Sequence, residues 1–355
     1  MSFEQIFNKK PEIKEHAHAR VNLIGEHTDY TGGFVMPTLL KFKISVEISI
    51  NKEKKYHVFS ESFKEEKKFN DFIKSKTNDW VDYVKGCLFV FYDENKNLNN
   101  NYLNIFISSN IPMERGISSS SALCVAILKS LNTLFQSQFS NKHIAILAQK
   151  VERDYIGVSG GIMDQMVSAI GINGKAFFLD CLSLKYELLN IPSEWVFCLI
   201  DSKIKRNLRD SSYNERYNEL KKAEEDIKVE YLGSLKMKDF DENKISNFLV
   251  RNRARHVVSE NERVLGAKKY LLENNIDRFG KLMNESHTSY SKDFEASTED
   301  VDIITQRSVE AGAAGSRLTG GGFGGFTVSL IDNNNFNMWH NKMEKYYTKE
   351  KIFRI

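Results

Sequence analysis

Cysteine is scarce in this chain, and its few copies lie far apart. The four cysteines form neither a CxxC pair nor a disulfide-dense pattern; they are Cys87, Cys124, Cys181 and Cys198. The sequence therefore predicts reduced, mostly buried thiols rather than a disulfide framework.

Long apolar runs are also missing. The first twenty residues lack the apolar core of about 7 to 15 residues that a signal peptide needs. No run of about 18 apolar residues, the length of a membrane-spanning helix, occurs elsewhere. We therefore expect a cytoplasmic protein without a membrane partner.

Charge of one sign is not in excess, and no internal repeat is visible. The net charge is +3, the pI is near 8.4, and the lysines are scattered along the chain. Such mild, dispersed charge gives no support to nucleic-acid binding. We therefore expect small molecules rather than nucleic acid as partners, and a monomer or weak dimer.

The length and the residue patterns predict two α+β domains. A chain of 355 residues exceeds the roughly 250 to 300 residues at which a single core stops growing. Alternating or apolar stretches predict strands at 43–50, 56–60, 175–180, 195–201 and 326–330, and helical spacing predicts helices at 123–135, 142–155, 213–230 and 257–274. Turn residues at 189–194 favour a boundary between an N-terminal domain, 1–190, and a C-terminal domain, 191–355.

A run of serines opens the first of these helices. Ser118 to Ser121 follow Gly116, and serine is a favoured helix N-cap whose position gives an anion access to the N–H groups of the first turn. A phosphate site and an ordinary serine-rich cap before a core helix both explain the run. Glu114, four residues before the serines, is unexpected beside a phosphate.

Three further segments carry side chains that suit a polar ligand. The segment ARVNLIGEHTDYTGGFVMP places Glu26, His27 and Asp29 within four positions, although His27 could be a structural histidine and H-x-D alone does not define a metal site. Asp164 sits in the otherwise apolar GVSGGIMDQMVSA, where a carboxylate is either capped structurally or kept for chemistry. The glycine-rich RLTGGGFGG, 317–325, is explained equally well by a tight turn or a bulge.

These segments, in this order, resemble the galactokinase branch of the GHMP kinase family. RVNLIGEHTDYTGGFVMP is similar to that branch's signature over eighteen residues, and GIMDQ, FLDCLSL, SSYNERYNEL and LTGGGFGG match as well. The resemblance implies an N-terminal domain like ribosomal protein S5 domain 2, a ferredoxin-like C-terminal GHMP domain, and an active site in the cleft between them. It also implies transfer of the γ-phosphoryl of ATP to the anomeric hydroxyl of galactose, with Mg²⁺, as in the Leloir pathway of galactose catabolism.

The resemblance assigns roles to particular positions. Asp164 is similar to the aspartate that orients the sugar hydroxyl or accepts its proton, and Arg20 to the arginine that keeps this aspartate ionised and stabilises charge on the transferring group. The implied sugar ligands are Glu26, His27, Asp29, Gly161 and Tyr213. The implied ATP-binding residues are Gly116, Ser118, Ser119, Ser120, Trp80 and Tyr83, and the implied Mg²⁺ ligands are Ser120 and Glu152.

The serine loop departs from the family pattern P-x-G-x-G-L-S-S-S-A. Glu114 stands where the first glycine is expected, Arg115 follows it, and Ser121 replaces the first alanine. Two alternatives therefore remain beside a galactokinase. One is a kinase of another sugar, such as N-acetylgalactosamine or L-arabinose, and the other is a catalytically silent sensor of galactose and ATP.

Overall fold

The computed structural model describes residues 1–72, 76–96, 98, 101–112, 117–204, 209–348 and 351–355, without the side chains of residues 209–211. The described residues form two compact units. Unit 1 contains Met1–Arg20, Leu40–Pro112 and Ser118–Ile170, and unit 2 contains Val21–Leu39, Ile117 and Gly171–Ile355. Each unit is described by itself below.

Unit 1 combines a mixed sheet with a group of helices. Its strands are β1 (Ile13–Asn22, up to Arg20), β3 (Pro37–Ile50, from Leu40), β4 (Tyr56–Ser60), β5 (Glu65–Phe69) and β6 (Leu103–Ser109). Its helices are α1 (Phe3–Phe7), α2 (Val81–Glu94), α3 (Ser119–Phe135), α4 (Asn141–Lys150), the π-helical turn η1 (Val151–Ile156) and α5 (Met163–Ile170).

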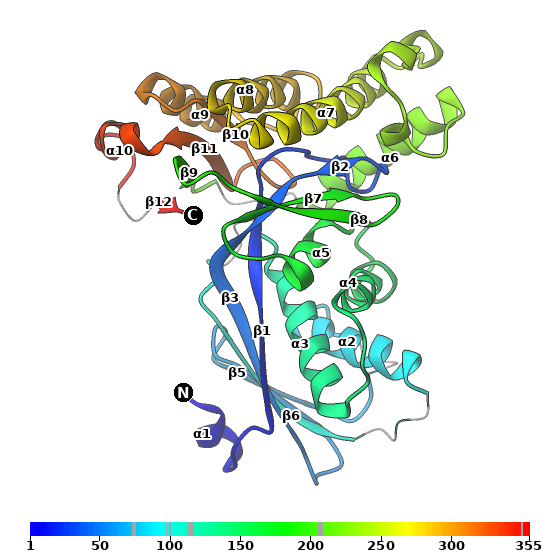
Figure 1. The fold of residues 1–355 in the computed structure, drawn as a ribbon. Helices are drawn as coiled ribbons and strands as arrows, with labels where there is room; N and C mark the ends of the chain where they lie inside the picture. Colours follow the sequence, from blue (N-terminus) through cyan, green and yellow to red (C-terminus); the bar gives the residue numbers. More distant parts are fainter. Residues whose placement is uncertain (73–75, 97, 99–100, 113–116, 205–208, 349–350) are drawn as a thin grey trace. The chain divides into compact units, whose positions relative to one another are not determined.

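The strand order in unit 1 is β1-β3-β6-β4-β5. β3 and β6 are antiparallel, with Val46 opposite Ile107 and Ile48 opposite Ile105, and these four side chains are buried. β4 runs parallel to β6, and the chain between them passes through α2, as a parallel connection requires. Helices α2 to α5 pack on one another and lie along one face of this sheet (Figure 1).

Unit 2 contains an antiparallel four-stranded sheet of order β10-β11-β9-β12. Its strands are β9 (Trp195–Asp201), β10 (Gly315–Leu318), β11 (Phe326–Asp332) and β12 (Ile352–Arg354), and a second group contains β2 (Phe34–Val35), β7 (Lys175–Asp180) and β8 (Lys185–Asn190). The helices are α6 (Arg209–Ile227), α7 (Phe248–Leu272), α8 (Ile276–Lys292), α9 (Glu299–Ala311) and α10 (Phe336–Glu344), and the short turns are η2 (Leu232–Ser234), η3 (Met237–Asp239), η4 (Glu242–Lys244) and η5 (Asn333–Asn335).

Helices α8 and α9 contact β10 and β11, and α7 packs on α8 (Figure 1). One core of unit 2 includes Val257 and Val258 of α7, Tyr290 of α8 and Phe294, all fully buried. A second core contains Cys198, Ile331 and Trp339. The first core, which also contains Leu318 of β10, fixes the places from which α7, α8 and β10 present their polar side chains.

The predicted elements are confirmed, with shifts at some ends. β4, β7 and β9 have the predicted bounds, and α6 and α7 begin earlier than predicted. The helix predicted at 142–155 is instead α4 followed by the π-helical turn η1. Because the two compact units draw on segments that alternate along the chain, the boundary after residue 190 stays a prediction. In the part of the chain that the structure describes, no helix is long and apolar enough to cross a membrane.

Candidate active site

In unit 1, Arg20 holds Asp164 with two parallel hydrogen bonds. Arg20, near the end of β1, donates from Nε to Asp164 Oδ1 at 2.5 Å and from Nη2 to Asp164 Oδ2 at 2.7 Å. The Arg20 side chain is 6% exposed, whereas that of Asp164, in the first turn of α5, is 24% exposed. A two-point guanidinium–carboxylate pair is both strong and directional, so the carboxylate is fixed yet accessible.

Ser118 also donates its hydroxyl to Asp164, at Oδ2. This contact corrects the simple capping interpretation. Ser118 is the N-cap of α3, but it has φ 61° and its side chain makes no cap hydrogen bond. Its hydroxyl serves the carboxylate, which leaves the N–H groups of the first turn of α3 without a side-chain cap from Ser118, as an anion-binding helix terminus requires.

Glu152 lies in η1 and is surrounded by neutral donors. Ser121 donates to Glu152 Oε1 at 2.9 Å, Gln165 donates to Oε2 at 2.6 Å, and the Ser120 hydroxyl also hydrogen-bonds to the Glu152 side chain. Burial, together with the negative charge of Asp164, raises the pKa of Glu152 to about 7. The set is one carboxylate with serine hydroxyls, all oxygen donors, which suits Mg²⁺.

The described residues contain no group of three or more His, Cys, Asp or Glu arranged to hold a metal ion by themselves. Mg²⁺ in phosphoryl-transfer enzymes commonly uses one or two carboxylates and completes its shell with water and phosphate oxygens. One carboxylate therefore fits a metal that arrives with a nucleotide.

The predicted adenine-lining residues begin α2. Trp80 donates its indole N–H to Glu65 Oε2 at 2.7 Å, and its ring stacks on Phe63 with centroids 5.7 Å apart. Tyr83 is half-buried one turn further along. Gly161 is buried just before α5. The predicted ligand contacts of Trp80, Tyr83 and Gly161 stay predictions. Gly116, with Glu114 and Arg115, lies outside the described residues, and Ser119 is exposed.

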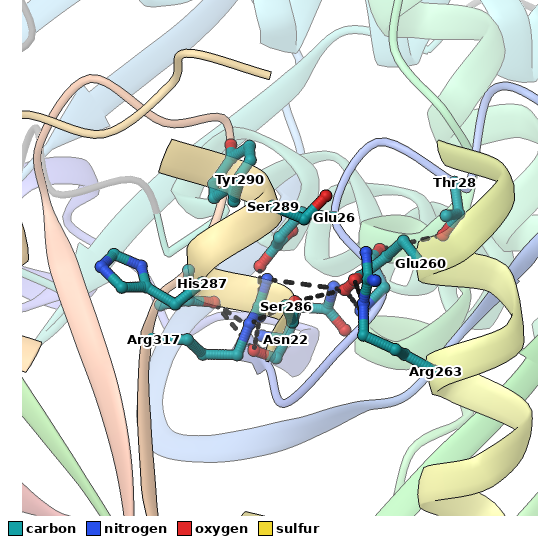
Figure 2. Close-up of polar contacts among 12 residues, drawn as sticks. Asn22, Glu26, Thr28, Glu260, Arg263, Ser286, His287, Ser289, Tyr290 and Arg317 are labelled. Atoms are coloured by element: carbon teal, nitrogen blue, oxygen red, sulfur yellow. Dashed lines mark hydrogen bonds and ion pairs between the residues drawn. The ribbon is translucent and has the colours of Figure 1, made fainter. Parts of the chain in front are cut away.

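In unit 2, Glu26 is nearly inaccessible. It is 2% exposed, and its Oε1 accepts from the N–H of Gly320 at 2.9 Å and from Arg317 Nη1 at 3.1 Å (Figure 2). The preceding Gly25 has φ 105°, and a Cβ there would lie 2.9 Å from both the Phe34 carbonyl oxygen and Val264 Cγ2. Only glycine fits this turn, which directs Glu26 inward.

His27 links two tyrosines by both ring nitrogens. Tyr290 donates its single proton to the carbonyl of Gly320 at 2.8 Å, so it accepts from His27 Nε2 at 2.9 Å. In the neutral imidazole, Nδ1 then accepts from the Tyr30 hydroxyl at 2.7 Å. His27 itself has φ 62°. His27 therefore has a structural role, and its predicted contact with a sugar stays a prediction.

The remaining predicted sugar ligands lie near His27 in the chain or in space. Tyr213, on α6, has its ring centroid 5.4 Å from that of His27. Asp29 is half-buried in the loop after His27. Unit 2 thus brings Glu26, His27 and Tyr213 together, and unit 1 brings Arg20, Asp164 and the serine run together.

Sequence reasoning missed several residues of these sets. Arg317, Glu260 and Ser286 surround Glu26 and Gly25, and Ser121 and Gln165 hold Glu152. The sequence around Glu260 gives no local signal, because this glutamate stands in the polar run SENER, 259–263, of α7. Its burial appears only in the structure, and a buried charge is rare unless it is paired.

Three family models match parts of this chain. The model described as GHMP kinases N terminal domain matches residues 82–172, that described as GHMP kinases C terminal matches 267–344, and the galactokinase galactose-binding signature matches 1–50. Galactokinase of Fusobacterium nucleatum is 35% identical over 98% of this chain and 93% of its own length. Galactokinase of Lacticaseibacillus casei is 34% identical over 99% of this chain and 93% of its own length.

Solved structures give the same result. The crystal structure of Lactococcus lactis galactokinase complexed with galactose matches with a TM-score of 0.92 and 30% identity, covering 99% of this chain and 95% of that one. Mevalonate kinase of Methanococcus jannaschii, at 19% identity and a TM-score of 0.71, shares the fold, with 96% and 97% of the two chains covered. The expected GHMP kinase fold is therefore confirmed.

The chain belongs to the GHMP kinases. Within them it is a member of the galactokinase family, the ATP-dependent sugar kinases.

Proposed function

We propose that this chain transfers the γ-phosphoryl group of ATP to the anomeric hydroxyl of α-D-galactose, giving galactose 1-phosphate and ADP. The bond between the γ-phosphorus and the β,γ-bridging oxygen breaks, and a bond from the sugar O1 to that phosphorus forms. The reaction would take place in the cytoplasm, as the first step of galactose catabolism. The observation that carries the proposal is the Arg20–Asp164 pair, because it supplies a carboxylate and a cation in one fixed unit.

Asp164 would orient the anomeric hydroxyl and take its proton as the O–P bond forms. Because Arg20 fixes both oxygens of this carboxylate, orientation and electrostatic activation would contribute at least as much as proton abstraction. Arg20 would stabilise the charge on the transferring phosphoryl group. Phosphoryl transfer asks a protein mainly for such positioning and charge.

The nucleotide would bind at the start of α3. The N–H groups of its first turn and the hydroxyls of Ser119 and Ser120 would face the phosphates, with Trp80 and Tyr83 near the base. Glu152 and Ser120 would hold Mg²⁺, whose chemistry when bound is to neutralise charge on the phosphate oxygens. Their all-oxygen donors, described above, support this assignment.

The sugar hydroxyls would be bound by Glu26, His27, Asp29 and Tyr213, with the backbone at Gly161. The closeness of Glu26, His27 and Tyr213 within unit 2 supports this part of the proposal. Because buried acceptors left unpaired are costly, a set of this kind rejects sugars that lack the matching hydroxyl.

One experiment tests the proposal against both alternatives. ADP release is measured with galactose, N-acetylgalactosamine, L-arabinose and no sugar. We expect the highest kcat/KM with galactose and negligible release without sugar. A higher kcat/KM for another sugar would reassign the substrate. Galactose binding in calorimetry without any sugar-dependent turnover would instead identify a silent sensor.

A further inference from the structure

A fully buried arginine of unit 2 connects the predicted sugar-binding turn to three other elements. Arg317, on β10, is 0% exposed. It donates from Nε to Ser286 of α8 at 3.1 Å and from Nη1 to Glu26 Oε1 at 3.1 Å, and its Nη2 lies 3.8 Å from Glu260 Oε1 (Figure 2). One guanidinium therefore forms ion pairs with two carboxylates from distant parts of the sequence.

Glu260, on α7, holds the backbone of the same turn. It is 0% exposed, and its Oε1 accepts from the N–H of Gly25 at 2.9 Å and from the hydroxyl of Ser286 at 2.6 Å, while Oε2 accepts from Arg263 Nε at 2.6 Å. Burial acts to raise the pKa of Glu260, but the positive charges of Arg263 and Arg317 outweigh it and hold that pKa at about 2. Glu260 is thus an anion in the folded protein.

The turn before Glu26 is held at successive positions. Arg317 Nη1 also lies 3.5 Å from the carbonyl oxygens of Asn22 and Leu23. Gly25 is held through its N–H by Glu260, and Glu26 through Oε1 by Arg317 and Gly320. Among the described residues no hydrogen bond reaches Glu26 Oε2. Oε1 is saturated, and Oε2 is the acceptor that remains.

We propose that Arg317, Glu260 and Ser286 are positioning residues for sugar specificity: they fix the Glu26 carboxylate so that Oε2 accepts one hydroxyl of the sugar. The proposal rests on the function proposed above and extends it to residues that do not touch the substrate. A hydroxyl acceptor held in a single orientation discriminates against sugars lacking that hydroxyl, whereas a mobile one discriminates weakly.

The test first identifies the sugar hydroxyl that Glu26 binds. The kcat/KM of galactose is divided by that of the 2-, 3-, 4- and 6-deoxygalactoses, for the unaltered protein and for Glu26→Gln. The deoxy sugar whose ratio changes most in Glu26→Gln marks the hydroxyl. This step defines a single selectivity ratio for the variants that follow.

Ser286→Ala is the informative variant, because it removes one hydroxyl that serves both Arg317 and Glu260 without removing a charge. Ser308→Ala is its matched control. Ser308 is also a fully buried helical serine of unit 2, on α9, where it donates to Ser329 Oγ at 2.8 Å and accepts from Trp339 Nε1 at 3.0 Å. Glu260→Gln and Arg317→Lys, which keep size or charge, complete the set.

We expect Ser286→Ala and Glu260→Gln to reduce that one selectivity ratio about tenfold and to raise the galactose KM, with the ATP KM unchanged. Ser308→Ala should lower the Tm about as much as Ser286→Ala does, but it should leave the selectivity ratio unchanged. Arg317→Lys should retain part of the selectivity that Arg317→Met loses. If Ser286→Ala and Glu260→Gln lower only the Tm and keep the ratio within twofold, the cluster is purely structural and the inference is wrong.

Failure of the proposed function would give a different pattern. An unaltered protein that releases no ADP with any sugar is not a kinase, and the inference is then decided by calorimetric binding of the same five sugars. Loss of discrimination in Ser286→Ala would still support positioning of Glu26. Absence of sugar binding in the unaltered protein would overturn both proposals.

Discussion

Ser118 donates its hydroxyl to Asp164, the carboxylate that Arg20 already holds at both oxygens. Among the described residues, Asp164 therefore accepts three hydrogen bonds from two side chains, both in unit 1. The serine at the start of the predicted phosphate site is thus connected to the predicted base. Under the proposed function, this hydroxyl would link ATP binding to the position of Asp164.

This link predicts that Ser118→Ala lowers kcat about tenfold, because one of three bonds orienting Asp164 is lost while its Arg20 pair remains. The galactose KM should change little. Asp164→Asn, which removes the charge, should lower kcat by roughly a thousandfold or more in a folded protein. Steady-state kinetics with both substrates varied measures these effects.

Two controls separate chemistry from backbone strain. Ser118 has φ 61°, where glycine is preferred, so Ser118→Gly removes the hydroxyl and relieves strain at once. Ser118→Gly should be more stable than Ser118→Ala and should have the same reduced kcat. Ser130→Ala, at a buried serine further along α3 whose hydroxyl donates to the carbonyl oxygen of Ala126 at 2.9 Å, should not slow the step that Asp164 serves. If Ser118→Gly restored the full kcat, the hydroxyl would have no role in orienting Asp164.

Local patterns were sufficient to predict most elements of the fold. Strands β4, β7 and β9 were predicted with their observed bounds because alternation or continuous apolar character within five to seven residues determines which faces are buried. The signature around Glu26 likewise predicted which loops carry polar side chains. In both cases the signal lies within a few residues of the feature it predicts.

The contacts within the candidate site could not be predicted in this way. Arg317 and Glu26 are separated by 291 positions, and no local period indicates that a guanidinium on β10 will reach the turn after β1. The π-helical turn η1 was predicted as an α-helix, because the sequence does not show that Glu152 there meets Ser121 and Gln165. Pairing of buried charges depends on packing between distant segments, which periodicity does not record.

Glu152→Gln should weaken Mg²⁺-dependent nucleotide binding. The substitution retains the side-chain volume but removes the only carboxylate of the predicted metal site. We expect the Mg²⁺ concentration for half-maximal activity to rise about tenfold or more. Calorimetric binding of ADP with and without Mg²⁺ gives a readout independent of turnover. Ser121→Ala, which removes only a donor to Glu152, should have the smaller effect. If Glu152→Gln had the same Mg²⁺ dependence as the unaltered protein, the metal assignment would be wrong.

Glu114→Gly should lower the KM for ATP modestly. A carboxylate four residues before the serine run in the sequence would repel the phosphates of ATP, and salt screens exposed charges beyond about 10 Å. Galactose binding should not change. Higher salt should reduce the difference in the KM for ATP between the unaltered protein and Glu114→Gly. Loss of activity in Glu114→Gly would indicate that Glu114 and Arg115 together hold the nucleotide.

The stability of unit 2 should fall as the pH is lowered from about 6.5, the ordinary histidine pKa. Burial lowers the pKa of His256 to about 3, and the pKa of Glu260 is about 2, so in the unfolded chain both groups bind protons at a higher pH than in the folded protein. Stability is then present above the unfolded pKa values and is lost towards the folded ones. His256 dominates between about pH 6.5 and 4.5, at a slope on the order of 1 kcal/mol per pH unit, and Glu260 adds to it below that range. Thermal unfolding of His256→Gln should depend less on pH in the upper window than that of His340→Gln, a control on α10. Equal slopes in the two variants would show that His256 does not govern acid stability.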